Sequence, residues 1–167
     1  VTRKFPHITG IDVSGTIFES TSPIFKVGEK VLVTGYDMGM NTDGGHAQYV
    51  KVPASWVARI PDSITDKEIM IFGTAGLTAA LSVNELIEHE IIPESGDILV
   101  TGATGGVGSI AISILRKLGY NITAISGKKE RVDFLKDIGA NEVIFREDFE
   151  KQSKKPLLRS EEHTSEL

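Results

Sequence analysis

The residues best suited to chemistry in this sequence form a glycine-rich segment, Val100-Thr-Gly-Ala-Thr-Gly-Gly-Val-Gly-Ser109. Its glycines stand at positions 102, 105, 106 and 108, between an apolar run and a stretch with helical periodicity. Glycine suits such a turn because it accepts unusual backbone angles and lets an anion approach the main chain. The free N–H groups of the next helix would bind that anion. A purely structural glycine turn is the alternative, but the flanking pattern favours a phosphate-binding loop for a dinucleotide.

The end of the next apolar run indicates which dinucleotide is bound. Sites for NADH usually carry Asp or Glu there, which accepts the ribose 2′-hydroxyl. Here the run ends in Ser126-Gly127-Lys128, with Lys129 and Arg131 just behind. A hydroxyl, an open backbone and a cation suit a 2′-phosphate dianion, which a carboxylate would repel. We therefore expect NADPH, with Lys128 as the main cation; Lys129 and Arg131 are more often solvated surface residues.

The elements that position these residues alternate between strand and helix. We expect strands at 97–101, 121–126 and 142–145, and helices at 107–118 and 129–138. Val107, Ile110, Ala111, Ile114, Leu115 and Leu118 form one apolar stripe, and Gly119 and Gly139 end the two helices. The pattern predicts βαβ units in a parallel sheet, an α/β fold that is the first half of a Rossmann doubly wound sheet. Only one half is present, so we expect a fragment whose sheet has an unpaired edge after residues 142–145.

The first sixty residues are typical of short β-strands. Runs at 11–17, 30–34 and 47–52 are separated by turn signals such as Asp43-Gly44-Gly45, which predicts a small barrel or sandwich. Beyond Pro61, Thr65 and Glu68 have the spacing of a capping box, and a helix is expected over about 74–89.

Composition excludes several classes of site. The net charge of −5 gives no basic surface for nucleic acid, and no apolar run approaches the roughly 20 residues of a membrane helix, so neither partner is expected. With no cysteine, disulfides, thiolate catalysis and cysteine-built zinc sites are excluded from this stretch, which fits a cytoplasmic protein. The four histidines are scattered, and no metal site is expected.

Residues 159–167, Arg-Ser-Glu-Glu-His-Thr-Ser-Glu-Leu, have no periodicity. They match a common sequencing-library adapter read in frame. We interpret them as read-through rather than native sequence and exclude His163 from any site.

Several segments together resemble the medium-chain dehydrogenases/reductases, in particular the zinc-free acrylyl-CoA reductase and quinone oxidoreductase subgroup. They are residues 5–15 (FPHITGIDVSG), 44–49 (GGHAQY), 73–79 (GTAGLTA), 101–108 (TGATGGVG) and Ser126-Gly-Lys128. The resemblance implies a partial GroES-like catalytic β domain at 1–62 and a partial NADP-binding Rossmann domain at 63–158.

By resemblance, the pyrophosphate lies on Thr104, Gly105, Gly106 and Val107, and the 2′-phosphate on Ser126, Gly127 and Lys128. Arg146 matches an arginine near the adenosine phosphate; a plain surface arginine is the alternative. Lys128 replaces a more common arginine, which keeps the charge but loses the forked geometry. Zinc-dependent relatives have Gly-His-Glu where this chain has Gly10-Ile11-Asp12, and a hydrocarbon side chain cannot bind a metal. Asp12 is expected to be structural, and no catalytic acid can be assigned; Tyr36 and Tyr49 are more often packing residues.

The resemblance implies NADPH-dependent reduction of an activated C=C bond, acrylyl-CoA to propionyl-CoA, by a homodimer without zinc. An NADPH quinone reductase is the alternative, and a non-catalytic, crystallin-like NADPH-binding protein is a third hypothesis. Fold alone cannot choose among them.

Overall fold

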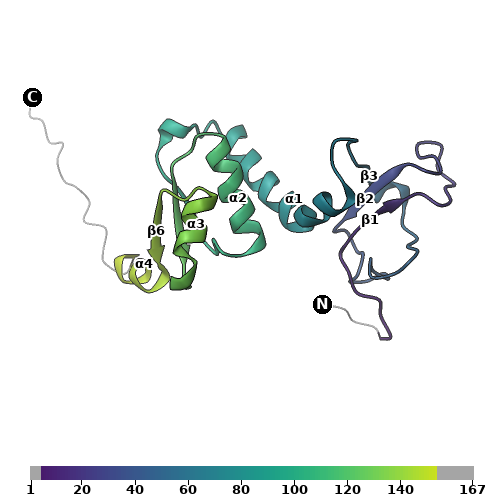
Figure 1. The fold of residues 1–167 in the computed structure, drawn as a ribbon, viewed down its shortest axis with the longest axis horizontal. Coiled ribbons are helices and arrows are strands. Elements are labelled where there is room, and N and C mark those ends of the chain that lie inside the picture. Colours follow the sequence, from purple (N-terminus) through teal and green to yellow (C-terminus); the bar gives the residue numbers. More distant parts are fainter. Residues whose placement is uncertain (1–4, 154–167) are drawn as a thin grey trace, which may run out of the picture. The chain divides into compact units, whose positions relative to one another are not determined.

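The computed structural model of the protein describes residues 5–153, which form two compact units that divide between Glu90 and Ile91 (Figure 1). The interpretation of residues 159–167 lies outside the described residues and stays a prediction. The same holds for the part of the Rossmann-like segment beyond residue 153.

The first unit is built on an antiparallel sheet in the order β1-β2-β3, of Asp12–Thr16, Lys30–Thr34 and Val57–Arg59. Asp12 pairs with Thr34, and Val31 pairs with Arg59. The predicted strands at 11–17 and 30–34 are confirmed as β1 and β2. A short 3₁₀ helix, η1 (Ala54–Trp56), leads into β3, which the sequence pattern did not indicate.

The predicted strand at 47–52 is wrong. This segment has the composition of a strand, but its residues form bends and an irregular stretch, and the Ala47 N–H donates to Gly45 O at 2.8 Å. A strand needs a hydrogen-bonded neighbour about 4.8 Å away. No strand among residues 5–153 pairs with this segment, so the composition alone does not produce one.

Helix α1 (Asp66–Glu88) begins eight residues before the predicted start, directly after its N-cap Thr65. The predicted capping box is confirmed: the Thr65 N–H donates to Glu68 Oε2 at 2.8 Å, and the Glu68 N–H donates to Thr65 Oγ1 at 3.2 Å. Gly73 interrupts the helix with φ 48° and ψ −150°, a conformation that only glycine adopts readily. The helix packs against β1 and β2 of its own unit.

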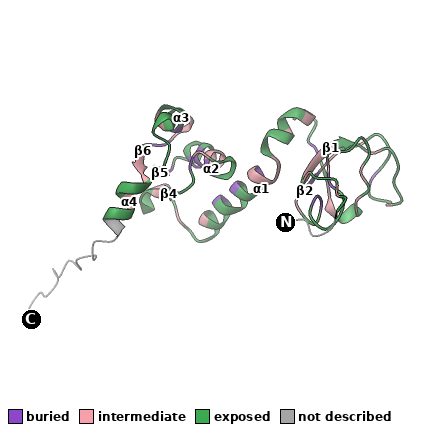
Figure 2. Ribbon diagram, turned by 90° about the horizontal axis from the view of Figure 1, so that it is seen from below, coloured by how far each residue is buried: buried purple, intermediate pink, exposed green. Residues whose placement is uncertain are grey.

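Contrary to the expectation from the sequence, α1 is long and apolar enough to cross a membrane by length and composition, with a mean hydropathy of 1.4 over its most apolar 18 residues. The sequence shows no uninterrupted apolar run here, because threonine, serine and glycine lie between the apolar residues of the helix. The core helices of water-soluble proteins meet the same two criteria. Figure 2 shows α1 mostly exposed, with few buried positions. That no membrane partner exists stays a prediction.

The second unit contains the parallel sheet predicted from the sequence, in the order β4-β5-β6, of Ile98–Val100, Ile122–Ser126 and Glu142–Phe145. Helix α2 (Gly106–Lys117) connects the first two strands. The 3₁₀ turn η3 (Lys129–Arg131) and α3 (Val132–Ile138) connect the next two, so the predicted helix at 129–138 begins as a tighter turn. A further 3₁₀ turn, η2 (Pro93–Ser95), precedes β4, and α4 (Arg146–Ser153) was not predicted.

Within residues 5–153, no strand pairs with the outer edge of β6, as expected, but β4 is also an outer strand of this sheet. The helix stops are confirmed: Gly119 and Gly139 both have positive φ and donate their N–H groups to carbonyls of the last helical turn.

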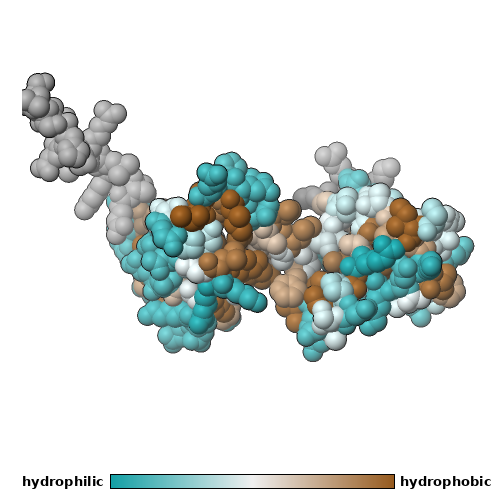
Figure 3. Space-filling view, turned by 90° about the horizontal axis from the view of Figure 1, so that it is seen from above, coloured by the Kyte–Doolittle hydropathy of each residue, from teal (hydrophilic) through white to brown (hydrophobic). Residues whose placement is uncertain are grey.

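The buried face of α2 differs from the predicted stripe. Ala111 and Leu115 are buried as expected, but Val107 and Leu118 are 39% and 44% exposed. Ile112, which lay outside the stripe, is fully buried. The buried face thus follows Gly108, Ala111, Ile112 and Leu115, and the helix is rotated by part of a turn relative to the predicted stripe. Figure 3 shows apolar side chains at the surface of both units.

Candidate functional site

The sequence-predicted binding residues of the second unit follow the carboxyl ends of its three parallel strands. Register pairs Val100 with Ala124, and Ser126 with Phe145. The glycine loop after β4, the Ser126 turn after β5 and Arg146 after β6 therefore lie along one edge of the sheet. This is the edge where open α/β sheets bind ligands.

The glycine loop is a tight turn in which glycine is required at two positions. Gly102 has φ +59°, and its carbonyl accepts the Gly105 N–H at 2.9 Å. A Cβ on Gly108 would lie 2.5 Å from the Gly102 oxygen and 2.9 Å from Ala103 Cα. Because both neighbours are backbone atoms, a side chain at 108 would push the loop away from the helix. The loop geometry thus accounts for Gly102 and Gly108.

The start of α2 can bind an anion. Its N-cap is Gly105, which offers no side-chain hydrogen bond, and its first turn contains no acidic residue. The first N–H groups of the helix consequently have no side-chain acceptor, and the helix dipole places partial positive charge there. Thr104 is half-buried, and Gly105, Gly106 and Val107 are exposed. The four residues expected to hold the pyrophosphate surround this helix end.

The turn after β5 is ordered by Ser126. This residue is 2% exposed, and its Oγ accepts the Lys128 N–H at 3.0 Å. The hydroxyl therefore fixes the turn, and its contact with a phosphate stays a prediction. Gly127 has no positive φ and nothing within 4 Å of the Cβ position. The backbone conformation of Gly127 therefore does not require glycine. The absence of a side chain leaves open space beside Lys128.

Four basic residues lie at or just beyond the ends of β5 and β6, and they differ in their surroundings. The Lys129 ammonium lies 5.6 Å from the centre of the Phe145 ring, and the Arg131 guanidinium lies 5.9 Å from that of Phe134. Lys128 and Arg146 are exposed, and within residues 5–153 neither forms an ion pair. Among the described residues, none of these four cations is therefore held in an ion pair with a carboxylate.

In the first unit, Asp12 binds the kink of α1. Its Oδ1 accepts the Thr74 hydroxyl at 2.6 Å, and its Oδ2 lies 2.7 Å from where a Cβ on Gly73 would be. Asp12 is half-buried, and its carboxylate joins β1 to the helix across 62 residues of sequence. This geometry fits the structural role expected for Asp12. The resemblance at residues 73–79 drew attention to Gly73 and Thr74, but it did not indicate that they contact Asp12.

The described histidines contact the main chain or a hydroxyl. His7 Nε2 lies 2.8 Å from Gly39 O, His46 Nδ1 lies 2.9 Å from Thr9 Oγ1, and His89 Nδ1 lies 2.8 Å from Glu85 O. Within residues 5–153, no three His, Asp or Glu side chains are grouped so that they could hold a metal ion. The Ile11 side chain is a hydrocarbon and offers no donor atom to a metal.

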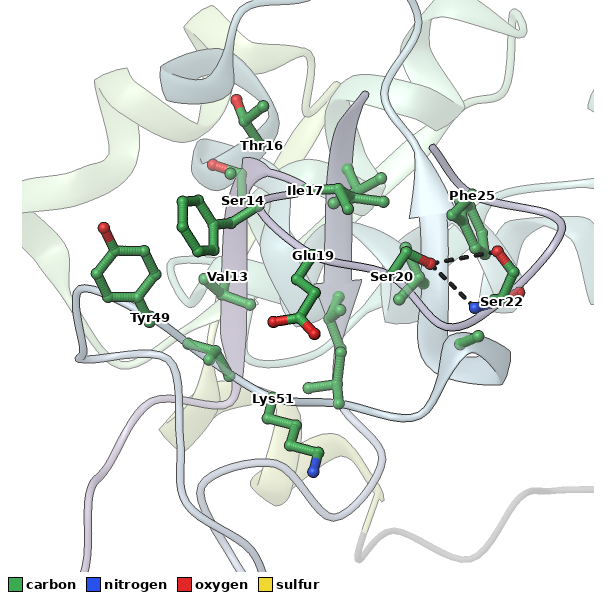
Figure 4. Close-up of a pocket in the computed structure, with 18 of the residues that line it drawn as sticks. Val13, Ser14, Thr16, Ile17, Glu19, Ser20, Ser22, Phe25, Tyr49 and Lys51 are labelled. Carbon is green, nitrogen blue, oxygen red and sulfur yellow. Dashed lines mark hydrogen bonds between the residues drawn. The ribbon is translucent and has the colours of Figure 1, made fainter. Parts of the chain in front are cut away.

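The tyrosines considered as catalytic candidates both contact aromatic rings. Tyr36 stacks on Trp56 with ring centres 5.1 Å apart, and Tyr49 meets Phe18 edge-on at 5.4 Å. Tyr49 also lines a cavity of about 630 Å³ between β1 and the segments at 17–22 and 47–52. Figure 4 shows Glu19 and Lys51 among its lining residues. The cavity walls are largely aliphatic and hydroxyl side chains. The Ser14 and Ser20 hydroxyls donate to main-chain carbonyls of Asp66 and Ser22 rather than to the Glu19 carboxylate.

Comparison with known proteins is consistent with this arrangement. Residues 1–62 match the family of the alcohol dehydrogenase GroES-like domain. Over 148 residues the chain is 49% identical to YhfP of Bacillus subtilis, whose name classes it with the quinone oxidoreductases, covering 89% of this chain and 45% of YhfP. It is 41% identical to the acrylyl-CoA reductase AcuI of Ruegeria pomeroyi, covering 93% of this chain and 47% of AcuI.

Among solved structures, the yhdH oxidoreductase of Salmonella enterica in complex with NADP has a TM-score of 0.87 at 43% identity, covering 89% of this chain and 46% of yhdH. Bacillus subtilis yhfP with NAD bound has a TM-score of 0.85, with the same coverage of this chain and 45% of its own. The chain spans less than half the length of these relatives. Residues 1–62 thus match an alcohol dehydrogenase GroES-like domain, and the chain is similar to part of oxidoreductases that are named as a quinone oxidoreductase and an acrylyl-CoA reductase.

Proposed function

We propose that this chain supplies the NADPH-binding edge of a zinc-independent oxidoreductase that reduces an activated C=C bond. The observation that carries the proposal is the shared edge of the second unit. Three features follow the three adjacent strands there: the start of α2, whose first turn has no acidic residue, the Ser126-Gly127-Lys128 turn, and Arg146.

The residues at this edge fit NADPH. Thr104, Gly105, Gly106 and Val107 would hold the pyrophosphate through the N–H groups of the loop and helix. Lys128 would bind the 2′-phosphate in the space that Gly127 leaves open, with Arg146 near the adenosine phosphate. The bound cofactor would supply a hydride to the acceptor. The contribution of these residues is to hold the dinucleotide in one orientation.

The zinc-free part of the proposal rests on Ile11. The resemblance to zinc-dependent relatives places a histidine ligand of their metal at this position, and isoleucine has no donor atom for a metal that would polarise an alcohol or ketone. Among the described residues, Asp12 is already hydrogen-bonded to Thr74. The acceptor is therefore one that needs no Lewis acid, because its double bond is already conjugated to a carbonyl group.

For the acceptor we propose acrylyl-CoA, which would be reduced to propionyl-CoA. The similarity to AcuI supports this choice, whereas the similarity to YhfP favours a quinone as the second candidate. The two are distinguished by the rate of NADPH oxidation by the complete gene product with acrylyl-CoA and with a simple quinone. Tight NADPH binding with no turnover of either acceptor would instead support a non-catalytic binding protein.

The cofactor assignment is tested at Lys128. A hydrogen bond to a charged group contributes about 1.5–3 kcal/mol. We expect Lys128→Ala to lower kcat/KM for NADPH by about tenfold to a hundredfold, with the value for NADH nearly unchanged. Lys128→Arg is the control and should hold or improve the use of NADPH, because guanidinium can bind two phosphate oxygens. Equal losses for both cofactors would mean that Lys128 only supports the loop.

A further inference from the structure

Lys129 and Arg131 lie in the same 3₁₀ turn, but the aromatic contacts that they make differ in range. Arg131 lies over Phe134, three residues along its own helical segment, so that contact is local. Lys129 lies over Phe145, which is on a different strand. The Lys129 contact therefore directs a positive charge from the connection toward the sheet.

The position of Phe145 decides where that charge lies. Phe145 is the last residue of β6 and is paired in register with Ser126, the last residue of β5. It also directly precedes Arg146. An ammonium group above this ring is thus at the carboxyl edge, between the end of the strand that carries Ser126 and the start of α4.

Lys129 is well placed to take a second partner. Its side chain is exposed, and within residues 5–153 it forms no ion pair that would neutralise it. A cation over a ring uses one side of the ammonium, and its N–H groups can still donate to an anion. Because the ring already restricts the long side chain, less conformational freedom is lost when the anion binds.

Lys128, by contrast, is fixed at its backbone, where its N–H donates to Ser126 Oγ at 3.0 Å. Its side chain makes no ring contact or ion pair among the described residues. The two adjacent lysines therefore present their ammonium groups differently: one has an ordered backbone and a free side chain, and the other has an ordered side chain.

We propose that Lys129 is a second specificity-determining cation for the 2′-phosphate of NADPH, and that Phe145 is the positioning residue that holds its ammonium at the carboxyl edge. This inference rests on the proposed binding of NADPH at this edge. In this inference Lys129 supplies the charge, and Phe145 holds that charge in place.

The test measures dissociation constants of NADPH and NADH by fluorescence titration of the complete gene product. Lys129→Met keeps the length of the side chain and removes its charge, and it should weaken NADPH binding by about twofold to fivefold, as expected for an exposed charge pair. NADH binding should be unchanged. Lys129→Arg should restore the wild-type ratio of the two constants.

Phe145→Leu keeps an apolar side chain and removes the ring. We expect it to weaken NADPH binding in the same direction and by less, and to have no additional effect in the Lys129→Met background. Lys136→Met is the matched control, since Lys136 is an exposed lysine beside Gly139 and Asn141, which precede β6 rather than follow it. It should leave both constants unchanged.

An unchanged NADPH-to-NADH ratio in Lys129→Met, with a clear loss in Lys128→Ala, would overturn this inference and leave the proposed function intact. If neither dinucleotide binds to the wild-type protein, the proposed function itself fails. If Phe145→Leu lowers the melting temperature but leaves the ratio unchanged, Phe145 is a packing residue and its positioning role is wrong.

Discussion

The two units differ most in how their central strands are buried. In the second unit, all five residues of β5 are buried, and α2 and α3 pack against each other and against the sheet. In the first unit, Val33 is the one buried residue of the central strand β2, and Phe18, Ile24, Val27 and Tyr49 are more than half exposed. The comparison shows that a unit of alternating strands and helices can bury its central strand with elements that are adjacent in the sequence. The antiparallel unit leaves apolar surface uncovered by the described residues.

The sharpest way to test this contrast is to remove one leucine from each unit. Leu135 of α3 has no exposed surface, and Leu135→Ala should lower the free energy of unfolding by about 2–5 kcal/mol. Leu81 of α1 is 58% exposed. If its surface stays free in the complete gene product, Leu81→Ala should cost less than about 0.5 kcal/mol. Urea denaturation of both variants measures the difference, and an equally large loss at Leu81 would show that another segment covers α1.

The second test compares two glycines of the binding edge. A side chain at position 108 meets the backbone at 2.5 Å, so Gly108→Val should destabilise the protein by about 1–3 kcal/mol and abolish dinucleotide binding. Gly127→Ala has open space around it and should change stability by less than about 1 kcal/mol. Thermal melts and NADPH titrations read out both. A Gly108→Val protein with normal binding would refute the loop geometry.

The third test concerns the first unit, where two hydrogen bonds join β1 to α1: the Thr74 hydroxyl donates to Asp12 Oδ1 at 2.6 Å, and the Ser14 hydroxyl donates to the Asp66 carbonyl at 3.4 Å. Asp12→Ala removes the acceptor of the Thr74 hydroxyl and should cost about 1–2 kcal/mol in the free energy of unfolding. Asp43→Ala is the control, because Asp43 is an exposed aspartate in the same unit and should have little effect. Equal melting temperatures for the two variants would mean that the hydrogen bond between Asp12 and Thr74 contributes no measurable stability.

The smallest expected effect is the pH dependence of the α1 cap. The hydrogen bonds from the Thr65 side chain and then its backbone lower the pKa of the exposed Glu68 carboxyl below its ordinary value. A lowered pKa in the folded state contributes stability that is present at neutral pH and is lost as the pH falls below about 4.3 and through the folded-state value. Melts between pH 7 and pH 3 should show a slightly smaller pH dependence in Glu68→Gln. An identical dependence would mean that the cap contributes no measurable stability.

The second unit could be predicted from the sequence because its signals are local. Apolar runs, a helical period and the glycine stops specify β4 to β6 and the helices between them. Lys128 and the glycine loop could be placed at one edge because parallel strands align their carboxyl ends. The contact of Lys129 with Phe145 joins separate elements, and no period in the sequence encodes it.

The first unit was predicted less well for the same physical reason. Residues 47–52 have the composition of a strand, but a strand forms only where a neighbouring strand can pair with it, and composition does not indicate whether such a neighbour exists. The hydrogen bond between Asp12 and Thr74 joins residues 62 positions apart and lies at the kink of α1. One prediction in the second unit also failed: the apolar stripe of α2 was wrong by part of a turn, because Ile112, which it omitted, packs into the core.

The strand order of the second unit also has a consequence for the synthesis of the protein. Because β4, β5 and β6 are neighbours in the sheet in the order in which they occur in the chain, each strand can dock as soon as it leaves the ribosome. Successive strands are made seconds apart at about 5–20 residues per second, whereas a helix forms in about a microsecond. Each connecting helix therefore has time to form before the next strand arrives. Protease protection of stalled nascent chains should therefore increase stepwise, strand by strand.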